Sequence, residues 1–380
     1  MRRPEFARIG ADNVKAARGP FRGRATVVRS RALRFGTYHV FQCPPGQEPA
    51  RVVAEELARA ELAEALGFDD VWVPEQHFSP YCLAGDALLL AGHLAARTRR
   101  VRIGTAVVNL TFTHPLRFAE RVALLDHVTG GRVEVGVGRG YQFPQYGVFG
   151  VPIDETRGIF DEALDVVLRA WRGEEFTHAG RHFKIPNVRI WPAPLRPPGE
   201  VLLHAVNSPE SMARAIARGL PALMARPLSP FAEQVEEFAR YRAALAAAGV
   251  DSAPVLARAT VLKYAFLAPR RAEARTLARE ALEWDLAILQ HLTTPTTTEM
   301  PRGYELYERR GGRLPEYAYE DWLERVLLFD EPDGCAEKIA RLRDAGVERL
   351  LLWMGPGGVP HDLLVRSMRL FAEAVMPRFR

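Results

Sequence analysis

The chain has 380 residues, and its hydrophobic fraction of 48% and charged fraction of 26% are typical of a globular protein large enough for one barrel or two ordinary domains. It contains no run of about 18 apolar residues, so we expect no membrane span. Its three scattered cysteines, Cys43, Cys82 and Cys335, fit a reducing cytoplasm and lack the Cys/His spacing of a metal site.

The positive net charge of +5 comes from the N-terminal segment. Residues 1–34 contain ten Arg and Lys against two acidic side chains, which leaves residues 35–380 with a net charge of −3. A basic arm can bind nucleic acid or anionic lipid, but we expect a disordered extension and no nucleic-acid partner. The segment lacks the apolar core of a secretory signal. A start codon assigned upstream of the native one is a further interpretation, because the first strand-like run begins only at Phe35.

From Phe35 onward, short apolar runs alternate with segments of helical periodicity. Several runs are rich in Val, Ile or Leu without alternation, which is typical of strands buried on both faces. The expected strands are Phe35–Phe41, Asp70–Val73, Val101–Val107, Val133–Val137, Val201–Ala205, Pro221–Ala225, Leu256–Phe266 and Arg349–Met354. The expected helices are Glu48–Leu66, Asp86–Arg97, Leu116–Val128, Thr156–Trp171, Ser208–Arg218, Pro230–Ala248, Arg270–His291, Asp333–Ala345 and Asp362–Met376.

This alternation predicts a single α/β domain over residues 35–380, a (β/α)8 barrel of the TIM type with its active site at the C-terminal face. An open doubly wound sheet usually has fewer strands, and no Gly-x-Gly-x-x-Gly motif follows the first strand. Residues 176–198 combine prolines with isolated apolar residues and predict an inserted hairpin. Residues 292–319 have no periodicity and predict a loop that acts as a lid over the barrel mouth.

Three polar side chains, Glu75, Gln76 and His77, follow the second expected strand directly after Pro74. Polar groups at the C-terminal end of a parallel strand are where barrels build active sites. One interpretation is that they act on a ligand, with His77 as the group that titrates near neutral pH. The alternative is a half-buried His77 that is simply paired with Glu75.

Two further strand ends carry candidate ligand groups. The small residues of Gly104–Asn109 would let a flat ligand lie against the backbone, although ordinary barrel packing explains them as well. Arg139 lies between Gly138 and Gly140 after the fourth expected strand. A guanidinium flanked by glycines is suited to a phosphate group, and the alternative is a surface arginine in a turn.

The fifth expected strand is followed by Asn207 and by a helix start at Ser208-Pro209-Glu210-Ser211. Ser208 is a good N-cap and Pro209 suits the first helical position, so capping explains part of the pattern. A helix N-terminus with two hydroxyls is also an anion site. Arg139 and this helix would then bind one phosphate from neighbouring strands.

Several longer motifs occur in a characteristic order: Gly67-Phe-Asp-Asp-Val-Trp-Val-Pro-Glu-Gln-His-Phe, Ile103-Gly-Thr-Ala-Val, His114-Pro-Leu-Arg-Phe-Ala-Glu, Leu124-Leu-Asp-His-Val-Thr-Gly-Gly-Arg and Gly136-Val-Gly-Arg-Gly. On these motifs, the chain resembles the bacterial luciferase-like family of flavin-dependent monooxygenases over about residues 35–380. The resemblance looks closest to the luciferase subunits themselves.

The resemblance implies a barrel that binds FMN at its C-terminal rim. Arg139 would bind the phosphate together with the hydroxyls of Ser208 and Ser211, and a cis peptide at Ala106–Val107 would lie against the isoalloxazine. Trp284 would match a tryptophan of the flavin pocket, and Asn207 stands where the light-emitting subunit has an acid. The positions assigned to cofactor binding are Ala106, Val107, Arg139, Gly140, Asn207, Ser208, Ser211 and Trp284.

Two departures from the light-emitting subunit bear on activity. Gln76 stands where that subunit has its catalytic histidine, and Gly138 stands where it has a reactive cysteine. An amide cannot take up a proton at neutral pH, so we do not expect light emission. His77, with Glu75 and Gln76, is the expected catalytic group.

The function that the resemblance implies is a two-component monooxygenase. A separate flavin reductase supplies reduced FMN, and a flavin hydroperoxide formed with dioxygen oxygenates a small organic substrate, by hydroxylation or by oxygen insertion. The alternatives are a non-catalytic flavin-binding subunit and a deazaflavin-dependent oxidoreductase. We expect a cytoplasmic homodimer that uses the second and third helices, whose leucines include Leu88, Leu89, Leu90, Leu94, Leu124 and Leu125.

Overall fold

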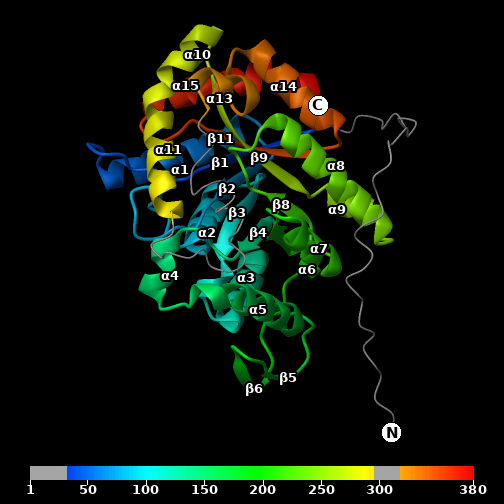
Figure 1. The fold of residues 1–380 in the computed structure, drawn as a ribbon. Helices are drawn as coiled ribbons and strands as arrows, with labels where there is room; N and C mark the ends of the chain where they lie inside the picture. Colours follow the sequence, from blue (N-terminus) through cyan, green and yellow to red (C-terminus); the bar gives the residue numbers. More distant parts are fainter. Residues whose placement is uncertain (1–31, 295–316) are drawn as a thin grey trace. The chain divides into compact units, whose positions relative to one another are not determined.

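The computed structural model describes residues 32–294 and 317–380, and in this part of the chain eight parallel strands close into a barrel (Figure 1). The barrel closes because β11 pairs with both β1 and β9, and β9 also pairs with β8. The predicted (β/α)8 fold is therefore confirmed. In pairing order, the strands are β1 (Arg34–Tyr38), β2 (Asp70–Val73), β3 (Arg102–Asn109), β4 (Val133–Gly138), β7 (Leu202–Ala205), β8 (Ala222–Met224), β9 (Thr260–Leu267) and β11 (Arg349–Met354).

Helices surround the barrel (Figure 1). Their starts follow local capping chemistry: the carboxylate of Asp86 accepts hydrogen bonds from the backbone N–H groups of Leu88 and Leu89 at 3.0 Å, and α2 then begins. The helices are α1 (Pro49–Ala65), α2 (Ala87–Arg97), α3 (Pro115–Val128), α4 (Phe143–Phe149), α5 (Thr156–Ala170), α6 (Pro198–Val201), α7 (Pro209–Ala217), α8 (Phe231–Ala247), α9 (Ser252–Leu256), α10 (Arg271–Leu277), α11 (Arg279–Thr293), α13 (Tyr319–Arg325), α14 (Pro332–Asp344) and α15 (His361–Ala374).

The structure corrects the sequence prediction in a few places. β9 begins at Thr260 and not at Leu256, because Asp251 caps the short helix α9 ahead of it. The single helix expected at Arg270–His291 is divided at Ala278 into α10 and α11. Helices α4 and α13 were not predicted, nor was the short strand β10 (Leu328–Asp330), which pairs with the end of β9.

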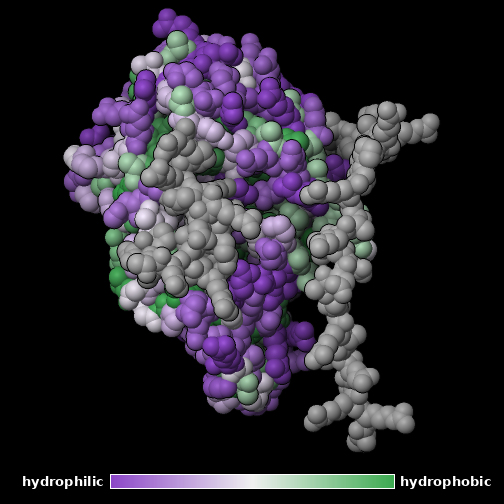
Figure 2. All heavy atoms as spheres, in the orientation of Figure 1, coloured by the Kyte–Doolittle hydropathy of each residue, from purple (hydrophilic) through white to green (hydrophobic). Residues whose placement is uncertain are grey.

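The hairpin predicted at residues 176–198 is present as the antiparallel strands β5 (Phe176–Ala179) and β6 (Lys184–Val188) (Figure 1). Glu162 of α5 holds its turn, because the carboxylate accepts hydrogen bonds from the backbone N–H groups of His182 and Phe183 at 3.0 and 2.9 Å. Burial raises the pKa of Glu162, but these bonds and the His178 ring outweigh it and lower the pKa to about 2. Hydrophilic residues cover this part of the surface (Figure 2).

A buried ionic cluster fills the N-terminal end of the barrel interior. Arg349, at the start of β11, is 0% exposed and donates to both carboxylate oxygens of Glu134 in β4. Its Nε lies 3.5 Å from Asp70 at the start of β2, and Arg258 lies 3.3 Å from Glu134. The cluster therefore connects β2 and β4 with β11, which lies across the barrel from β4. It lies at the N-terminal end of the strands, which contributes to stability, whereas the cavity lies at the C-terminal end.

Two predictions concern residues outside this description. Most of the extension expected at residues 1–34 falls on residues 1–31, and most of the expected lid falls on residues 295–316. The predicted boundary at residue 34 is too late, because Leu33 is buried and Arg34 begins β1. The described flanks of that lid are the end of α11 at Thr293 and the start of α13 at Tyr319. Within the described ranges, no helix has both the length and the apolar character needed to cross a membrane.

Candidate active site

A cavity of about 940 Å³ opens at the C-terminal end of the barrel, a volume near the upper end of the range for ligand pockets. Its walls are formed by the last residues of the strands and by the segments that follow them. This is the face on which TIM barrels place their sites. The strand residues in the wall include Tyr38, Ala106, Val107, Gly138, His204, Ala205, Leu223, Leu262, Tyr264 and Trp353.

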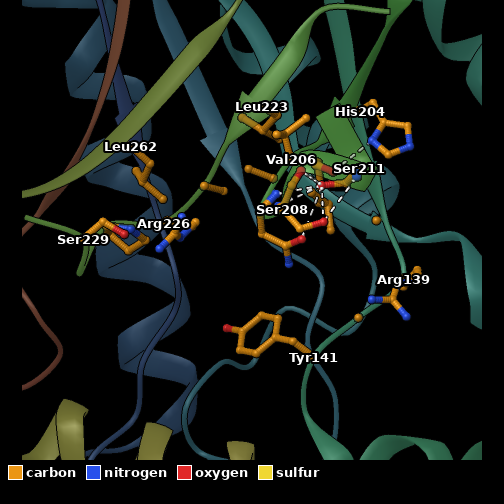
Figure 3. Close-up of a pocket in the computed structure, with 18 of the residues that line it drawn as sticks. Arg139, Tyr141, His204, Val206, Ser208, Ser211, Leu223, Arg226, Ser229 and Leu262 are labelled. Atoms are coloured by element: carbon orange, nitrogen blue, oxygen red, sulfur yellow. Dashed lines mark hydrogen bonds between the residues drawn. The ribbon is translucent and has the colours of Figure 1, made fainter. Parts of the chain in front are cut away.

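One corner of the cavity is built from the start of α7. Ser208 and Ser211 form a reciprocal cap: Ser211 Oγ accepts from the backbone N–H of Ser208 at 3.0 Å, and Ser208 Oγ accepts from that of Ser211 at 3.2 Å. Asn207 donates its backbone N–H to Ser211 Oγ at 3.0 Å. Figure 3 shows Ser208 and Ser211 with their hydrogen bonds as dashed lines. Hydroxyls and N–H groups at a helix N-terminus suit an anion.

Arginines complete this corner. Arg139 follows β4, the strand next to β7, and lines the same cavity; in Figure 3 it lies below and to the right of Ser208 and Ser211. Gly140 has a φ of +87°, and a Cβ there would lie 3.2 Å from the Tyr146 hydroxyl, so the turn that carries Arg139 requires glycine. Arg157, near the start of α5, also lines the cavity. Sequence reasoning missed Arg157, although its place at a helix start was a usable signal.

A neutral histidine lies beside this corner. His204 of β7 lines the cavity, and burial lowers its pKa to about 4. Its Nδ1 lies 2.8 Å from the carbonyl oxygen of Ala205, which places the ring hydrogen on that nitrogen. His204 therefore adds no positive charge to the anion corner at neutral pH.

Ala106 and Val107 of β3 form a closely packed ledge beside Gly138 of β4. The Ala106–Val107 peptide is cis, as the resemblance implies, and Tyr38 Oη donates to the Ala106 carbonyl at 2.7 Å. A Cβ on Gly138 would lie 2.8 Å from Val107 Cγ2 and 3.4 Å from the Ala205 Cβ. Glycine at position 138 thus keeps this wall open, where the light-emitting subunit has a cysteine.

The structure separates the three residues that follow β2. Gln76 lines the cavity, and its Oε1 accepts from Gln145 Nε2 at 2.9 Å. Glu75 faces β3 instead, where its carboxylate accepts from the backbone N–H of Asn109 at 3.0 Å. Neither Glu75 nor His77 is among the residues that line the cavity.

His77 lies in an aromatic cluster outside that wall. Its ring centroid is 4.9 Å from that of Phe149 and 6.2 Å from that of Phe112, and its Nε2 lies 3.6 Å from Glu75. His77 therefore resembles the alternative interpretation from the sequence, a half-buried histidine beside Glu75. Successive side chains after the strand point to different sides, so only the middle residue of the three reaches the cavity.

Trp284 also lies off the cavity wall. It is half-buried on α11, whereas Leu289 and Thr293 of the same helix line the cavity. Asp285, Leu289 and Thr293 are spaced by four residues and share one helix face, which turns Trp284 aside. Sequence reasoning missed that face and Tyr264 of β9, which also lines the cavity and donates to Asp285.

The fold is that of a TIM-barrel protein with its cavity at the C-terminal rim. A family model described as luciferase-like monooxygenase matches residues 33–349, and the chain belongs to this family. Protein y4vJ of Sinorhizobium fredii is 39% identical over 173 residues, but the match spans 46% of this chain and only about half, 49%, of y4vJ. The 4-hydroxyprotoasukamycin monooxygenase of Streptomyces nodosus subsp. asukaensis is 26% identical over 371 residues, which cover 91% of this chain and 92% of that enzyme.

Solved structures share the fold over 92% of this chain. Monooxygenase RslO1 from Streptomyces bottropensis is 28% identical, with a TM-score of 0.77 and 100% of its chain covered. The oxygenating constituent of 3,6-diketocamphane monooxygenase from Pseudomonas putida, in complex with FMN, is 19% identical with a TM-score of 0.73 and 100% covered. An F420-dependent secondary alcohol dehydrogenase is 18% identical with a TM-score of 0.71 and 100% covered.

Proposed function

We propose that this protein is an FMN-dependent monooxygenase that takes reduced FMN from a separate reductase and uses dioxygen to oxygenate a small organic substrate. The observation that carries the proposal is that the anion corner of Arg139, Ser208 and Ser211 lines the same cavity as the ledge at Ala106–Val107. A phosphate group and a planar ring system, held side by side, are what such a corner and ledge would bind together. When bound, the flavin supplies the oxygen-activating redox chemistry.

The chain's own residues have separate tasks in this proposal. Arg139, with Ser208 and Ser211, holds the phosphate, and Arg157 adds a second positive charge to that corner. The Tyr38 hydroxyl fixes the carbonyl of Ala106 and with it the ledge. The barrel encloses the reacting groups on all sides but the mouth, which limits access of water.

The substrate is expected to differ from that of a light-emitting subunit. Gln76 presents an amide to the cavity where that subunit has a histidine. The wall opposite the anion corner is aromatic, with Tyr264 stacked on Trp353 at a centroid distance of 4.1 Å. The name of the Streptomyces nodosus relative supports an organic substrate of some size.

A deazaflavin-dependent oxidoreductase is the second candidate, because an F420-dependent dehydrogenase shares the fold. A non-catalytic flavin-binding subunit is the third. Binding measurements can decide directly between FMN and F420, which both carry phosphate. Under anaerobic conditions, reduced FMN should bind at least about tenfold more tightly than reduced F420.

Mixing the FMN complex with dioxygen in a stopped-flow instrument then tests for catalysis. We expect a transient absorbance that matches neither reduced nor oxidised FMN. If reduced FMN binds but reoxidises as fast as it does free in solution, the non-catalytic subunit is favoured. If F420 binds more tightly, the oxidoreductase replaces our proposal.

A further inference from the structure

Asp285 is a buried carboxyl group directly behind the cavity wall. It lies on α11 and is 0% exposed, and no ion pair joins it to a cation among residues 32–294 and 317–380. Its partners are neutral: Tyr264 Oη donates to Oδ2 at 2.5 Å, and Gln42 Nε2 donates to Oδ1. A buried carboxylate without a cation is costly, so its retention calls for a reason.

The orientation of Gln42 is fixed by its other partner. Its Oε1 accepts from the backbone N–H of Gly357 at 2.6 Å, so the amide nitrogen must face Asp285. Gln42 can therefore only donate to this carboxyl group. Of the two partners that hydrogen-bond Asp285 in the described part of the chain, Tyr264 is the one that can both donate to and accept from it.

Tyr264 connects this carboxyl group to the cavity. It lies in the middle of β9, lines the cavity and is stacked on Trp353. Two more phenols line the same wall, with Tyr141 Oη lying 3.5 Å from Tyr81 Oη. Burial, and then the nearby Tyr141, Tyr264 and Asp285, raise the pKa of Tyr81. Within residues 32–294 and 317–380, the groups that face Asp285 are thus phenols and one amide, with no charged side chain.

The hydrogen bond between Asp285 and Tyr264 has two possible directions. When Asp285 is ionised, the phenol hydrogen points at the carboxylate and is not available to the cavity. When Asp285 is protonated, the acid donates to Tyr264 Oη, and the phenol hydrogen can turn to a ligand. Burial raises the pKa of Asp285 to about 6, so both states are populated near neutral pH.

We propose that Tyr264 and Asp285 form the proton-transfer pair of this cavity, an inference that rests on the proposed function. The carboxylic acid passes its proton to Tyr264 Oη while the phenol passes its own hydrogen to a basic oxygen of the reacting ligand. The products are a carboxylate, an unchanged neutral phenol and a protonated ligand, so protons and charge balance. Tyr264 is the catalytic residue, and Asp285 acts through it.

This pair does the work that the sequence assigned to His77. Of the three residues after β2 only Gln76 reaches the cavity, and an amide does not transfer protons at neutral pH. Proton transfer by a positioned group contributes about 10²–10⁴-fold to a rate. The competing explanation is that Asp285 merely fastens α11 to β9 and to the loop after β1.

The first test uses the protein without cofactor. Infrared difference spectra should show a protonated carboxyl group that titrates with a midpoint near pH 6 and disappears in Asp285→Asn. Tyr264→Phe should raise that midpoint, because the phenol hydrogen bond favours the carboxylate. A spectrum that is identical in the wild type and Asp285→Asn from pH 4 to 8 would overturn the inference.

The second test uses reduced FMN and dioxygen. The rate of reoxidation in the wild-type complex should fall as the pH rises through a midpoint near pH 6. Asp285→Asn and Tyr264→Phe should both abolish this pH dependence and slow the reaction at least about tenfold at low pH. The dissociation constant for FMN should stay within about twofold. Tyr241→Phe is the matched control, because Tyr241 is an equally buried phenol that accepts from the backbone N–H of Ala222, away from the cavity wall.

The outcomes separate this inference from the proposed function. If Arg139→Ala weakens FMN binding but both variants keep the wild-type pH profile, the proton-transfer pair is wrong and the FMN site stands. If Arg139→Ala leaves FMN binding unchanged, the proposed function fails first, and the inference fails with it. If Tyr241→Phe decreased the reoxidation rate as much as Tyr264→Phe does, the effect of Tyr264→Phe would be merely structural, which would overturn the inference.

Discussion

Gly138 illustrates how a single missing side chain shapes the cavity. Its position would bring a Cβ within 2.8 Å of Val107 Cγ2, closer than real contacts allow. Any larger residue must displace Val107 or shift the backbone at position 138. Gly138 therefore does more than replace the reactive cysteine of the light-emitting subunit, because the packing of this barrel requires glycine at that position.

Gly138→Ala should weaken FMN binding about tenfold, or about 1.4 kcal/mol, because Val107, which forms part of the ledge, is displaced. Overpacking should also cost roughly 1–3 kcal/mol of unfolding free energy. Fluorescence titration and urea unfolding measure the two effects. Gly147→Ala, where a Cβ meets nothing within 4 Å, is the control. Unchanged affinity in Gly138→Ala would contradict this account of the ledge.

Asp285 should also make stability depend on pH. Its folded-state pKa of about 6 lies above the ordinary 3.8, so its contribution is fully present below about pH 4 and is lost as the pH rises through 6. Relative to Asp285→Asn, the wild type should lose about 2 kcal/mol of unfolding free energy between pH 4 and pH 7.5. Urea unfolding of both proteins at each pH gives the difference. A difference that stays constant or grows with pH would contradict the assignment.

At the scale of elements, opposite ends of the barrel strands have different tasks. The N-terminal ends carry the ionic cluster around Arg349, and the C-terminal ends carry the cavity. Burial raises the pKa of Glu134, but the charge and hydrogen bonds of Arg349 outweigh it and lower the pKa well below its ordinary value. This division predicts that stability and ligand binding can be changed separately.

Arg349→Met should cost about 3–5 kcal/mol of unfolding free energy, since it leaves Glu134 and Asp70 buried with fewer partners. The dissociation constant for FMN should change by less than about twofold. Urea unfolding and fluorescence titration test both statements. Arg51→Ala, an exposed i,i+4 pair on α1, should cost less than about 1 kcal/mol. A similarly small loss in Arg349→Met would contradict the role of the cluster.

Helices and strands could be predicted from the sequence better than the residue pairs that contact each other across the fold. Apolar runs such as Arg349–Met354 locate the strands, and Ser208-Pro209 marks a helix start. The residues that meet across the fold are far apart: Gln42 and Asp285 are separated by 243 positions, and Glu134 and Arg349 by 215. Local patterns contain no information on such pairs. For the same reason His77 seemed as suitable as Gln76, because the direction of each side chain after Pro74 depends on the packing of the whole barrel.

At the scale of the whole molecule, the cavity combines segments from most of the chain. The anion corner comes from β4 and β7, the ledge from β3, and the proton-transfer pair from β9 and α11. Closure of the barrel alone brings these groups to one rim. The outer surface has its own features: on α2 and α3, Leu89 is 70% exposed, Leu124 is 55% and Val128 is 68%.

These exposed residues lead us to propose a homodimer through α2 and α3. Leu89→Glu combined with Leu124→Glu should convert it to a monomer, because charges would replace buried apolar contacts. Light scattering coupled to size exclusion measures the mass. Leu195→Glu, at a residue that is 54% exposed elsewhere, is the control. A wild-type protein that is monomeric at all concentrations would contradict the proposal.

The central claim is that this barrel binds a flavin by its phosphate, and a comparison of reduced FMN with reduced riboflavin tests it most directly. Anaerobic titration should show FMN binding at least about tenfold more tightly than riboflavin, which lacks the phosphate. Arg139→Ala should remove most of that preference and leave riboflavin binding nearly unchanged. Equal affinities for the two flavins in the wild type, or a preference that survives in Arg139→Ala, would contradict the account.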